Sequence, residues 1–146
     1  MTCSEKFIFE VKKPFLGYVW SFLRVLSYFL QQICFDRAEN PQEFKTLLEY
    51  NIGLTDICKT DYGNDNELDT SKYDVDGFIV KILEYKPKIV CFNGKNAAKV
   101  YLNQKKVDYG YQDKRVGESK IFIAPSTSGA ANGYWNRDIW KELVKK

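Results

Sequence analysis

The sequence contains no histidine, no C-x-x-C pair and no hydrophobic run long enough to span a membrane. Without histidine, the chain can form neither a Ser-His or Cys-His nucleophile pair nor a histidine-ligated metal site. Its four cysteines lie far apart, at Cys3, Cys34, Cys58 and Cys91. This spacing fits neither a zinc site nor a disulfide-rich secreted scaffold, so we expect reduced, mostly buried thiols and no metal.

The most apolar stretch, residues 15–30, raises the question of a signal or an anchor. It is interrupted by Arg24 and falls short of the roughly 20 residues that a spanning helix needs. No small-residue cleavage site follows it. We therefore expect a buried helix here, and a cytoplasmic protein that is neither secreted nor associated with a membrane.

The composition is that of an ordinary globular protein, with 45% hydrophobic and 28% charged residues, and a length of 146 residues fits a single domain spanning 1–146. The net charge of +3 is divided unevenly, with −3 in residues 1–73 and +6 in residues 74–146. A basic half favours a polyanionic partner. A solvated, lysine-rich surface explains the charge equally well.

Hydrophobic periodicity and turn residues divide the chain from residue 40 into alternating helices and strands. We expect helices over 41–50, 74–85, 95–102 and from Asn136 onward, strands over 52–55, 88–92 and 120–124, a long loop over 59–72 and a polar connection over 103–119. Strands separated by helices need crossover connections, which imply a parallel sheet and an α/β fold.

Ligands of such sheets bind beyond the carboxyl ends of the strands, which here brings three segments together. Asp56 follows the first strand, where it could polarise water or start a loop. Asn93-Gly94-Lys95 follows the second and opens a helix, so it suits either an anion or a simple turn. The third segment offers hydroxyls, amides and a glycine that suit phosphate or a base edge, or form an ordinary turn; it comprises Pro125, Ser126, Thr127, Ser128, Gly129, Ala130, Ala131 and Asn132.

Three segments in this order resemble the mismatch-specific uracil/thymine-DNA glycosylases, the Mug/TDG branch of the uracil-DNA glycosylase superfamily. They are Tyr50-Asn51-Ile52-Gly53-Leu54-Thr55-Asp56, Val90-Cys91-Phe92-Asn93-Gly94-Lys95 and Ile123-Ala124-Pro125-Ser126-Thr127-Ser128-Gly129-Ala130-Ala131. Trp135 and the segment 138–143 fit as well, so the resemblance covers about residues 40–146. It implies a three-layer α/β fold with a largely parallel sheet of about four strands and helices on both faces.

The resemblance also implies a function: flipping a deaminated or mispaired base, such as uracil in G·U or thymine in G·T, and hydrolysing its N-glycosidic bond in base excision repair. It implies no metal and no cofactor, and DNA, as a mismatched duplex or a single strand, as the partner. We expect a monomer. Asn93-Gly94-Lys95 and the segment 126–132 match the family's DNA- and base-binding segments, and Asp56 is the candidate catalytic residue.

Two departures from the family open a second hypothesis. Ala130-Ala131 stands where many relatives have a larger side chain that enters the duplex, and the glycine-rich motif expected after the first strand is not found. Residues 7–11 could form that strand, but Lys12-Lys13-Pro14-Phe15-Leu16-Gly17 does not match the motif. The N-terminus thus looks truncated or replaced. The alternatives are a catalytically impaired, glycosylase-derived DNA-binding module and a nucleotide-binding enzyme of another α/β family.

Overall fold

The computed structural model describes residues 7–10, 52–58, 69–127 and 133–143 of the chain. The helices expected over 15–30 and 41–50 lie outside these ranges, as do Cys3 and Cys34. Cys58 and Cys91 are both buried, as expected, and neither forms a disulfide. Within the described ranges, no helix has the length and apolar character needed to cross a membrane.

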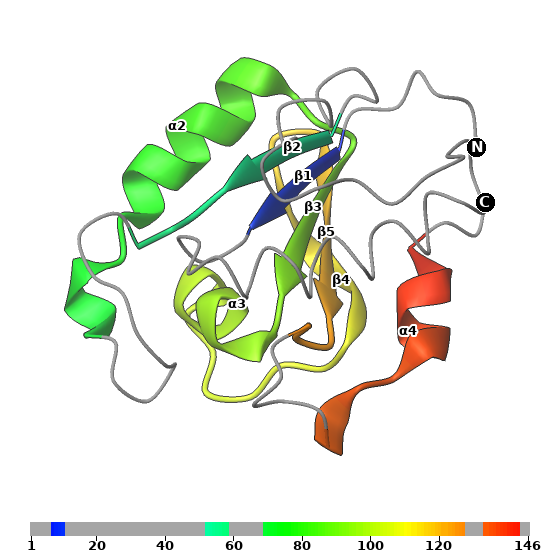
Figure 1. Ribbon diagram of the computed structural model, residues 1–146. Coiled ribbons are helices and arrows are strands. Elements are labelled where there is room, and N and C mark those ends of the chain that lie inside the picture. The colour runs from blue at the N-terminus through cyan, green and yellow to red at the C-terminus, as the bar shows by residue number, and fades with distance from the viewer. Residues whose placement is uncertain (1–6, 11–51, 59–68, 128–132, 144–146) are drawn as a thin grey trace, which may run out of the picture.

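A five-stranded sheet forms the centre of the described structure (Figure 1). Its strands are β1 (Phe7–Glu10), β2 (Ile52–Thr55), β3 (Ile89–Asn93), β4 (Gly110–Val116) and β5 (Ser119–Ala124), in the spatial order β2-β1-β3-β5-β4. The first four strands of that order are mutually parallel, and β4 alone runs antiparallel to its neighbour β5. The α/β class is confirmed, and the three expected strands run in the same direction, although β1 separates β2 from β3.

The strand β4 corrects the expectation of a polar connection over 103–119. Five of its seven residues are exposed or half-buried, so they lack the apolar run that marks the inner strands. Polar residues are tolerated here because β4 is an edge strand with solvent on one side. Gly117, at φ +56°, begins the two-residue turn into β5, where a glycine in the left-handed region is favoured. The sheet consequently has five strands instead of about four.

The helix α2 (Val75–Tyr85) begins and ends where local signals predict. The carboxylate of Asp74 accepts a hydrogen bond from the Gly77 amide at 2.8 Å, which caps the first turn. Lys86 adopts a left-handed conformation (φ 47°) and ends the helix directly before Pro87. Phe78 and Ile82 are buried, whereas Leu83 is 48% exposed.

The main core lies between one face of the sheet and the helices α2 and α3 (Lys95–Leu102). Alternate residues of two of the inner strands point into it: Val90 and Phe92 from β3, and Ile121 and Ile123 from β5. The rings of Phe78, Phe92 and Tyr101 meet at its centre, with centroids 5.6 to 5.8 Å apart.

The other face of the sheet is also buried, and the helix α4 (Arg137–Glu142) lies beside it. Cys91 and Phe122, which alternate with the core residues, are fully buried. The ring of Tyr111 packs edge-on against Phe122, and its hydroxyl donates a hydrogen bond to the Leu143 carbonyl at 3.2 Å. Figure 1 shows α2 and α4 with the sheet between them.

The long loop expected over 59–72 is described only at its end. There a short 3-10 helix, Thr70–Lys72, is capped by Asp69, whose carboxylate accepts hydrogen bonds from the amide and hydroxyl of Ser71. These bonds stabilise the charged form and lower the pKa of Asp69. Tyr73 then forms a β-bridge with Cys58, which ties this turn to the end of β2.

Candidate nucleic-acid interface at the carboxyl edge of the sheet

The parallel register brings the ends of three strands to one edge. Glu10, the last residue of β1, is level with Thr55 of β2 and with Phe92 of β3. One residue further along, Asn93 is level with Ala124 of β5. Asp56 and the segments that start at Asn93 and Pro125 therefore follow strands that end at the same edge. Since neighbouring strands lie ~4.8 Å apart, the ends of β2 and β3 are about 10 Å apart.

Asn93 and Thr127 form the closest connection between two of these segments. The Asn93 side-chain Nδ2 donates to Thr127 Oγ1, and the Thr127 amide donates to Asn93 Oδ1, both at 3.0 Å. Thr127 is only 6% exposed, so these bonds satisfy polar groups that have little access to water. One N–H and one oxygen lone pair of the Asn93 amide remain available for a ligand.

Gly94 allows the turn into α3 to approach the chain after β5. It has φ +112°, a conformation that side chains rarely adopt, and a Cβ at this position would lie 3.4 Å from the Cβ of Ser126. Its amide donates to the Ala124 carbonyl at 2.9 Å. The Asn-Gly pair thus builds a tight contact between two segments, in addition to making a turn.

Lys95 opens α3 at this edge, and its ammonium lies over an aromatic ring. The Nζ atom is 4.2 Å from the ring centroid of Tyr109, in the connection that leads to β4, which is a cation–π contact. Burial raises the pKa of Tyr109, and the nearby phenol of Tyr134 raises it further. Tyr134, in the segment before α4, is therefore within electrostatic range of Tyr109.

A buried indole holds the start of the third segment. Trp140 of α4 is fully buried, and its Nε1 donates to the Pro125 carbonyl at 3.1 Å. Trp135 packs against Trp140 with ring centroids 6.1 Å apart, and this contact forms a hydrophobic staple around the first turn of α4.

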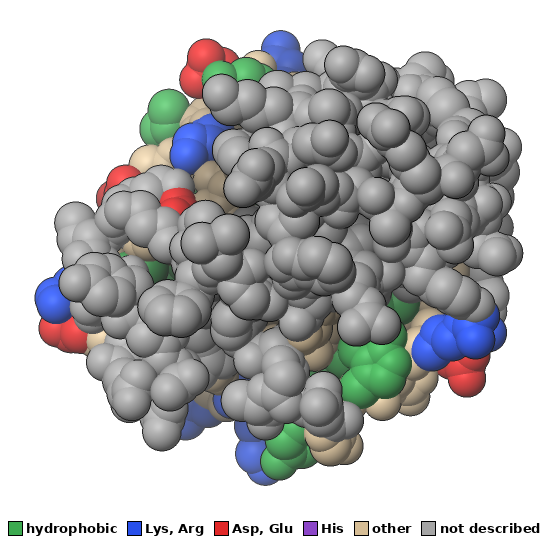
Figure 2. Space-filling model, in the orientation of Figure 1, with side chains coloured by type: hydrophobic (Ala, Val, Ile, Leu, Met, Phe, Trp, Pro, Cys, Tyr) green, Lys and Arg blue, Asp and Glu red, His purple; other side chains and the backbone are tan. Residues whose placement is uncertain are grey.

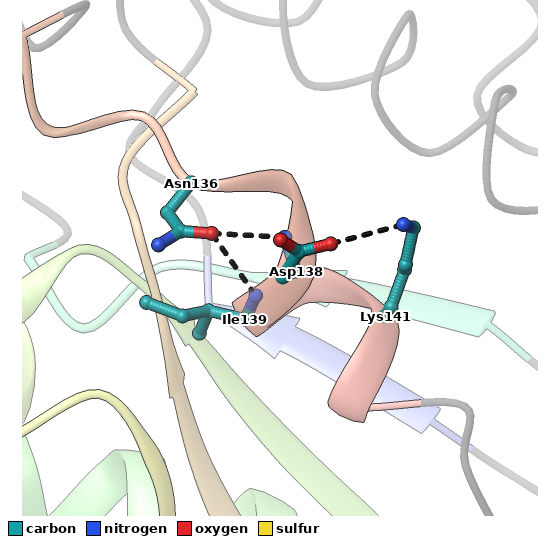
Figure 3. Close-up of polar contacts among 4 residues, drawn as sticks. All are labelled: Asn136, Asp138, Ile139 and Lys141. Atoms are coloured by element: carbon teal, nitrogen blue, oxygen red, sulfur yellow. Dashed lines mark hydrogen bonds and ion pairs between the residues drawn. The ribbon is translucent and has the colours of Figure 1, made fainter.

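The cap of α4 fixes where this helix begins (Figure 3). Asn136 Oδ1 accepts hydrogen bonds from the amides of Asp138, at 2.9 Å, and Ile139, at 3.4 Å. Lys141 and Asp138 form an ion pair at 2.9 Å on the exposed side, which contributes little because water screens it. The cap orients α4 so that Trp140 reaches Pro125.

The candidate catalytic residue, Asp56, lies just beyond β2, on the other side of β1 from Asn93. Its side chain is partly buried, and its Oδ1 atom is excluded from solvent. The neighbouring Thr55 accepts a hydrogen bond from Lys81 of α2 at 3.0 Å, and Ile57 accepts one from the Asp74 amide at 2.9 Å. The chain on either side of Asp56 is therefore attached to α2.

Of the predicted site residues, Asp56, Asn93, Gly94, Lys95, Ser126 and Thr127 lie at this edge, whereas Ser128, Gly129, Ala130, Ala131 and Asn132 lie outside the described residues. Sequence reasoning missed Glu10, which adds an acidic residue at the end of β1, as well as Tyr109 and Tyr134. The sequence does contain a signal for Tyr134, because it stands next to Trp135, directly before the residue that caps α4. Tyr109 has no such signal, because the connection in which it lies shows only a polar pattern.

No model of a known protein family matches the chain. In the described ranges, no three carboxylate or thiol side chains gather in a way that could hold a metal ion.

Proposed function

We propose that the protein is a DNA glycosylase that flips a uracil-type or mispaired base from DNA and hydrolyses its N-glycosidic bond. The observation that carries the proposal is the meeting of the three resembling segments at one sheet edge. They are separate in sequence, but they contain the carboxyl ends of β2, β3 and β5, and the Asn93–Thr127 pair joins the second to the third. With the resemblance, we further propose the three-layer arrangement, with α2 and α3 on one face and α4 on the other.

In the proposed reaction, the bond between C1′ of the sugar and the base nitrogen breaks, and its electron pair leaves with the base. A water molecule then bonds to C1′ and loses a proton, and the departing base anion takes up one proton, which leaves an abasic site and a neutral free base. The sugar becomes cationic as the bond breaks, so a carboxylate nearby stabilises it and can take the proton from water. Asp56 is the proposed carboxylate, and Glu10 is the second acidic residue at this edge.

The contacts at the start of the loop after β5 support the proposal that the protein binds DNA. The loop that leaves β5 starts from a point fixed by the Thr127 bonds to Asn93 and by the Trp140 bond to Pro125. A loop that grips DNA needs a fixed starting point, because it must hold a distorted strand. Unstacking the nucleobase from that strand costs a few kcal/mol. Asn93 is a positioning residue for this loop, and its free N–H and lone pair can reach a base edge.

The test is incubation of the protein at stoichiometric concentration with labelled single strands and with G·U, G·T and hypoxanthine duplexes, followed by alkaline cleavage of abasic sites. Strand cleavage is expected for at least one substrate, together with its loss in Asp56→Asn. Glu10→Gln is the matched comparison, because Glu10 is the acidic residue that ends the neighbouring strand β1. Absence of product with a folded protein would overturn the catalytic proposal. Product formation that survives Asp56→Asn would transfer the role to another residue.

A glycosylase-derived DNA-binding module is the second candidate, and the sequence after β1 favours it. β1 ends between β2 and β3, in the middle of the edge, yet the residues that follow are Val11-Lys12-Lys13-Pro14 and not the glycine-rich motif. DNA binding without product would support this candidate. Its affinity should fall with added salt, because phosphate contacts release counterions; an affinity independent of salt would contradict it.

A further inference from the structure

Two tyrosines and a lysine form a cluster beside the candidate site, and the proposed reaction does not use it. Lys95 Nζ lies 4.2 Å from the centroid of the Tyr109 ring, and Tyr134 is within electrostatic range of Tyr109. Tyr134 is 75% exposed, more than any other large hydrophobic residue in the described part of the chain. The cluster spans the start of α3, the connection to β4 and the segment before α4.

The exposure of Tyr134 is unusual for its surroundings. Its neighbour Trp135 is only 40% exposed and packs on Trp140 in the staple, and Trp140 is fully buried. The aromatic residues of this segment thus range from a buried anchor to a ring that faces solvent. An exposed aromatic ring beside a cation is the combination with which proteins stack an unpaired base and hold its phosphate.

The surrounding charge has the sign that this partner requires. Lys99 follows Lys95 by one turn of α3, and Lys105 and Lys106 are exposed in the connection toward Tyr109. Figure 2 shows basic and hydrophobic side chains next to each other along its lower margin, where Figure 1 has α3, this connection and the segment before α4. A strand of nucleic acid can place its phosphates on the lysines while a base covers the tyrosine ring.

We propose that Tyr134 is a stacking platform for an unpaired base next to the one that is excised, and that Lys95 holds the adjoining phosphate. The protein therefore prefers single-stranded or locally unpaired DNA to a fully paired duplex. The inference rests on the proposed DNA binding, but it assigns to Tyr134 and Lys95 a role in choosing the structure of the substrate, separate from excision. It needs no catalytic activity, so it holds for either of the two candidate functions.

The test is a fluorescence anisotropy titration of a labelled single strand and of the matching duplex. Tyr134→Ala should weaken binding to the single strand roughly 5- to 150-fold, the range for loss of one stacked base. Tyr134→Phe should bind within about twofold of the unmodified protein, because the ring is kept. Tyr85→Ala is the control: Tyr85 is another exposed tyrosine, 57% exposed, but it ends α2 just before β3 begins, away from the carboxyl edge.

The salt dependence separates the two roles. Tyr134→Ala should lower the affinity at every salt concentration and leave the slope of log K against log salt unchanged. Lys95→Gln should make that slope shallower by about 0.7, the value for one phosphate contact on a single strand. If Tyr134→Ala binds the single strand as tightly as the unmodified protein does, the stacking role of Tyr134 is overturned and the proposed function is not. Failure of the unmodified protein to bind either DNA would overturn both this inference and the proposed function.

Discussion

The side-chain amide of Asn93 forms two hydrogen bonds with Thr127, one as donor and one as acceptor, both at 3.0 Å. The two residues are 34 positions apart in sequence and belong to the segments that follow β3 and β5. A paired arrangement of this kind fixes both distance and orientation, so it sets where the chain leaves β5. At the carboxyl edge, the end of β3 and the segment after β5 are consequently held together by this pair of hydrogen bonds.

This pair predicts energetic coupling between the two residues. Asn93→Ala removes both bonds, whereas Thr127→Val removes only the one to Thr127 Oγ1, because the Thr127 backbone amide is kept. Each should destabilise the protein by about 1–3 kcal/mol, because each leaves a polar group of the pair without its partner. The double variant should lose less than the sum, with a coupling energy of about 0.5–3 kcal/mol. Urea denaturation of the four proteins gives these values. Strictly additive losses would show that the bond between Asn93 Nδ2 and Thr127 Oγ1, the one that Thr127→Val removes, contributes no coupling.

Trp140 predicts a second contribution to the same edge. Trp140→Phe removes the indole N–H, so the buried Pro125 carbonyl loses a donor, at a cost of about 1–3 kcal/mol. It also leaves a small void at this fully buried position, because phenylalanine is smaller than tryptophan. Trp135→Phe is the matched control, because Trp135 is 40% exposed and no indole hydrogen bond is at stake; its effect should stay within about 0.5 kcal/mol. Equal losses of stability in the two variants would show that the hydrogen bond to Pro125 does not cause the loss in Trp140→Phe.

Local signals predicted most of the described helices and inner strands. Asp74 marks the start of α2 and Pro87 follows its end. Asn136 caps α4, and the five-residue spacing of Trp135 and Trp140 forms the staple. In each case the deciding interaction joins residues that are close in sequence, so it can be read without knowing the fold.

The remaining features depend on contacts between distant segments. The strand β4 escaped prediction because only its ends, Gly110 and Val116, are buried, and what makes it a strand is its pairing with β5. The same holds for the site. Asn93 was predicted to contact a base, and nothing in the sequence indicates that its amide is engaged by Thr127. The positions of Tyr109 and Tyr134 likewise depend on how α3 and α4 meet the sheet.

Asn136 predicts a measurable capping contribution. Asn136→Ala should cost about 0.5–2 kcal/mol in the free energy of unfolding, because the amides of Asp138 and Ile139 lose their acceptor. Asn136→Asp should be nearly neutral, since a carboxylate accepts the same bonds and favours the positive end of the helix dipole. Lys141→Ala, which removes only the exposed ion pair, should change stability by less than about 0.5 kcal/mol.

The last prediction concerns the ionisation of Tyr109. Two causes raise its pKa: burial first, and then the charge that the Tyr134 phenol acquires when it ionises. Tyr134→Phe removes the second cause and keeps the first. The pKa of Tyr109 should therefore fall in this variant and still remain above the ordinary value of about 10.

This shift can be followed by NMR in protein labelled with ¹³C at the tyrosine Cζ, with the Tyr109 signal assigned by its absence in Tyr109→Phe. Tyr85→Phe is the control and should leave the Tyr109 curve in place, because Tyr85 lies at the end of α2. An unchanged pKa in Tyr134→Phe would show that the two phenols are too far apart to interact. It would also remove the geometric basis for a shared aromatic surface, independently of any DNA-binding measurement.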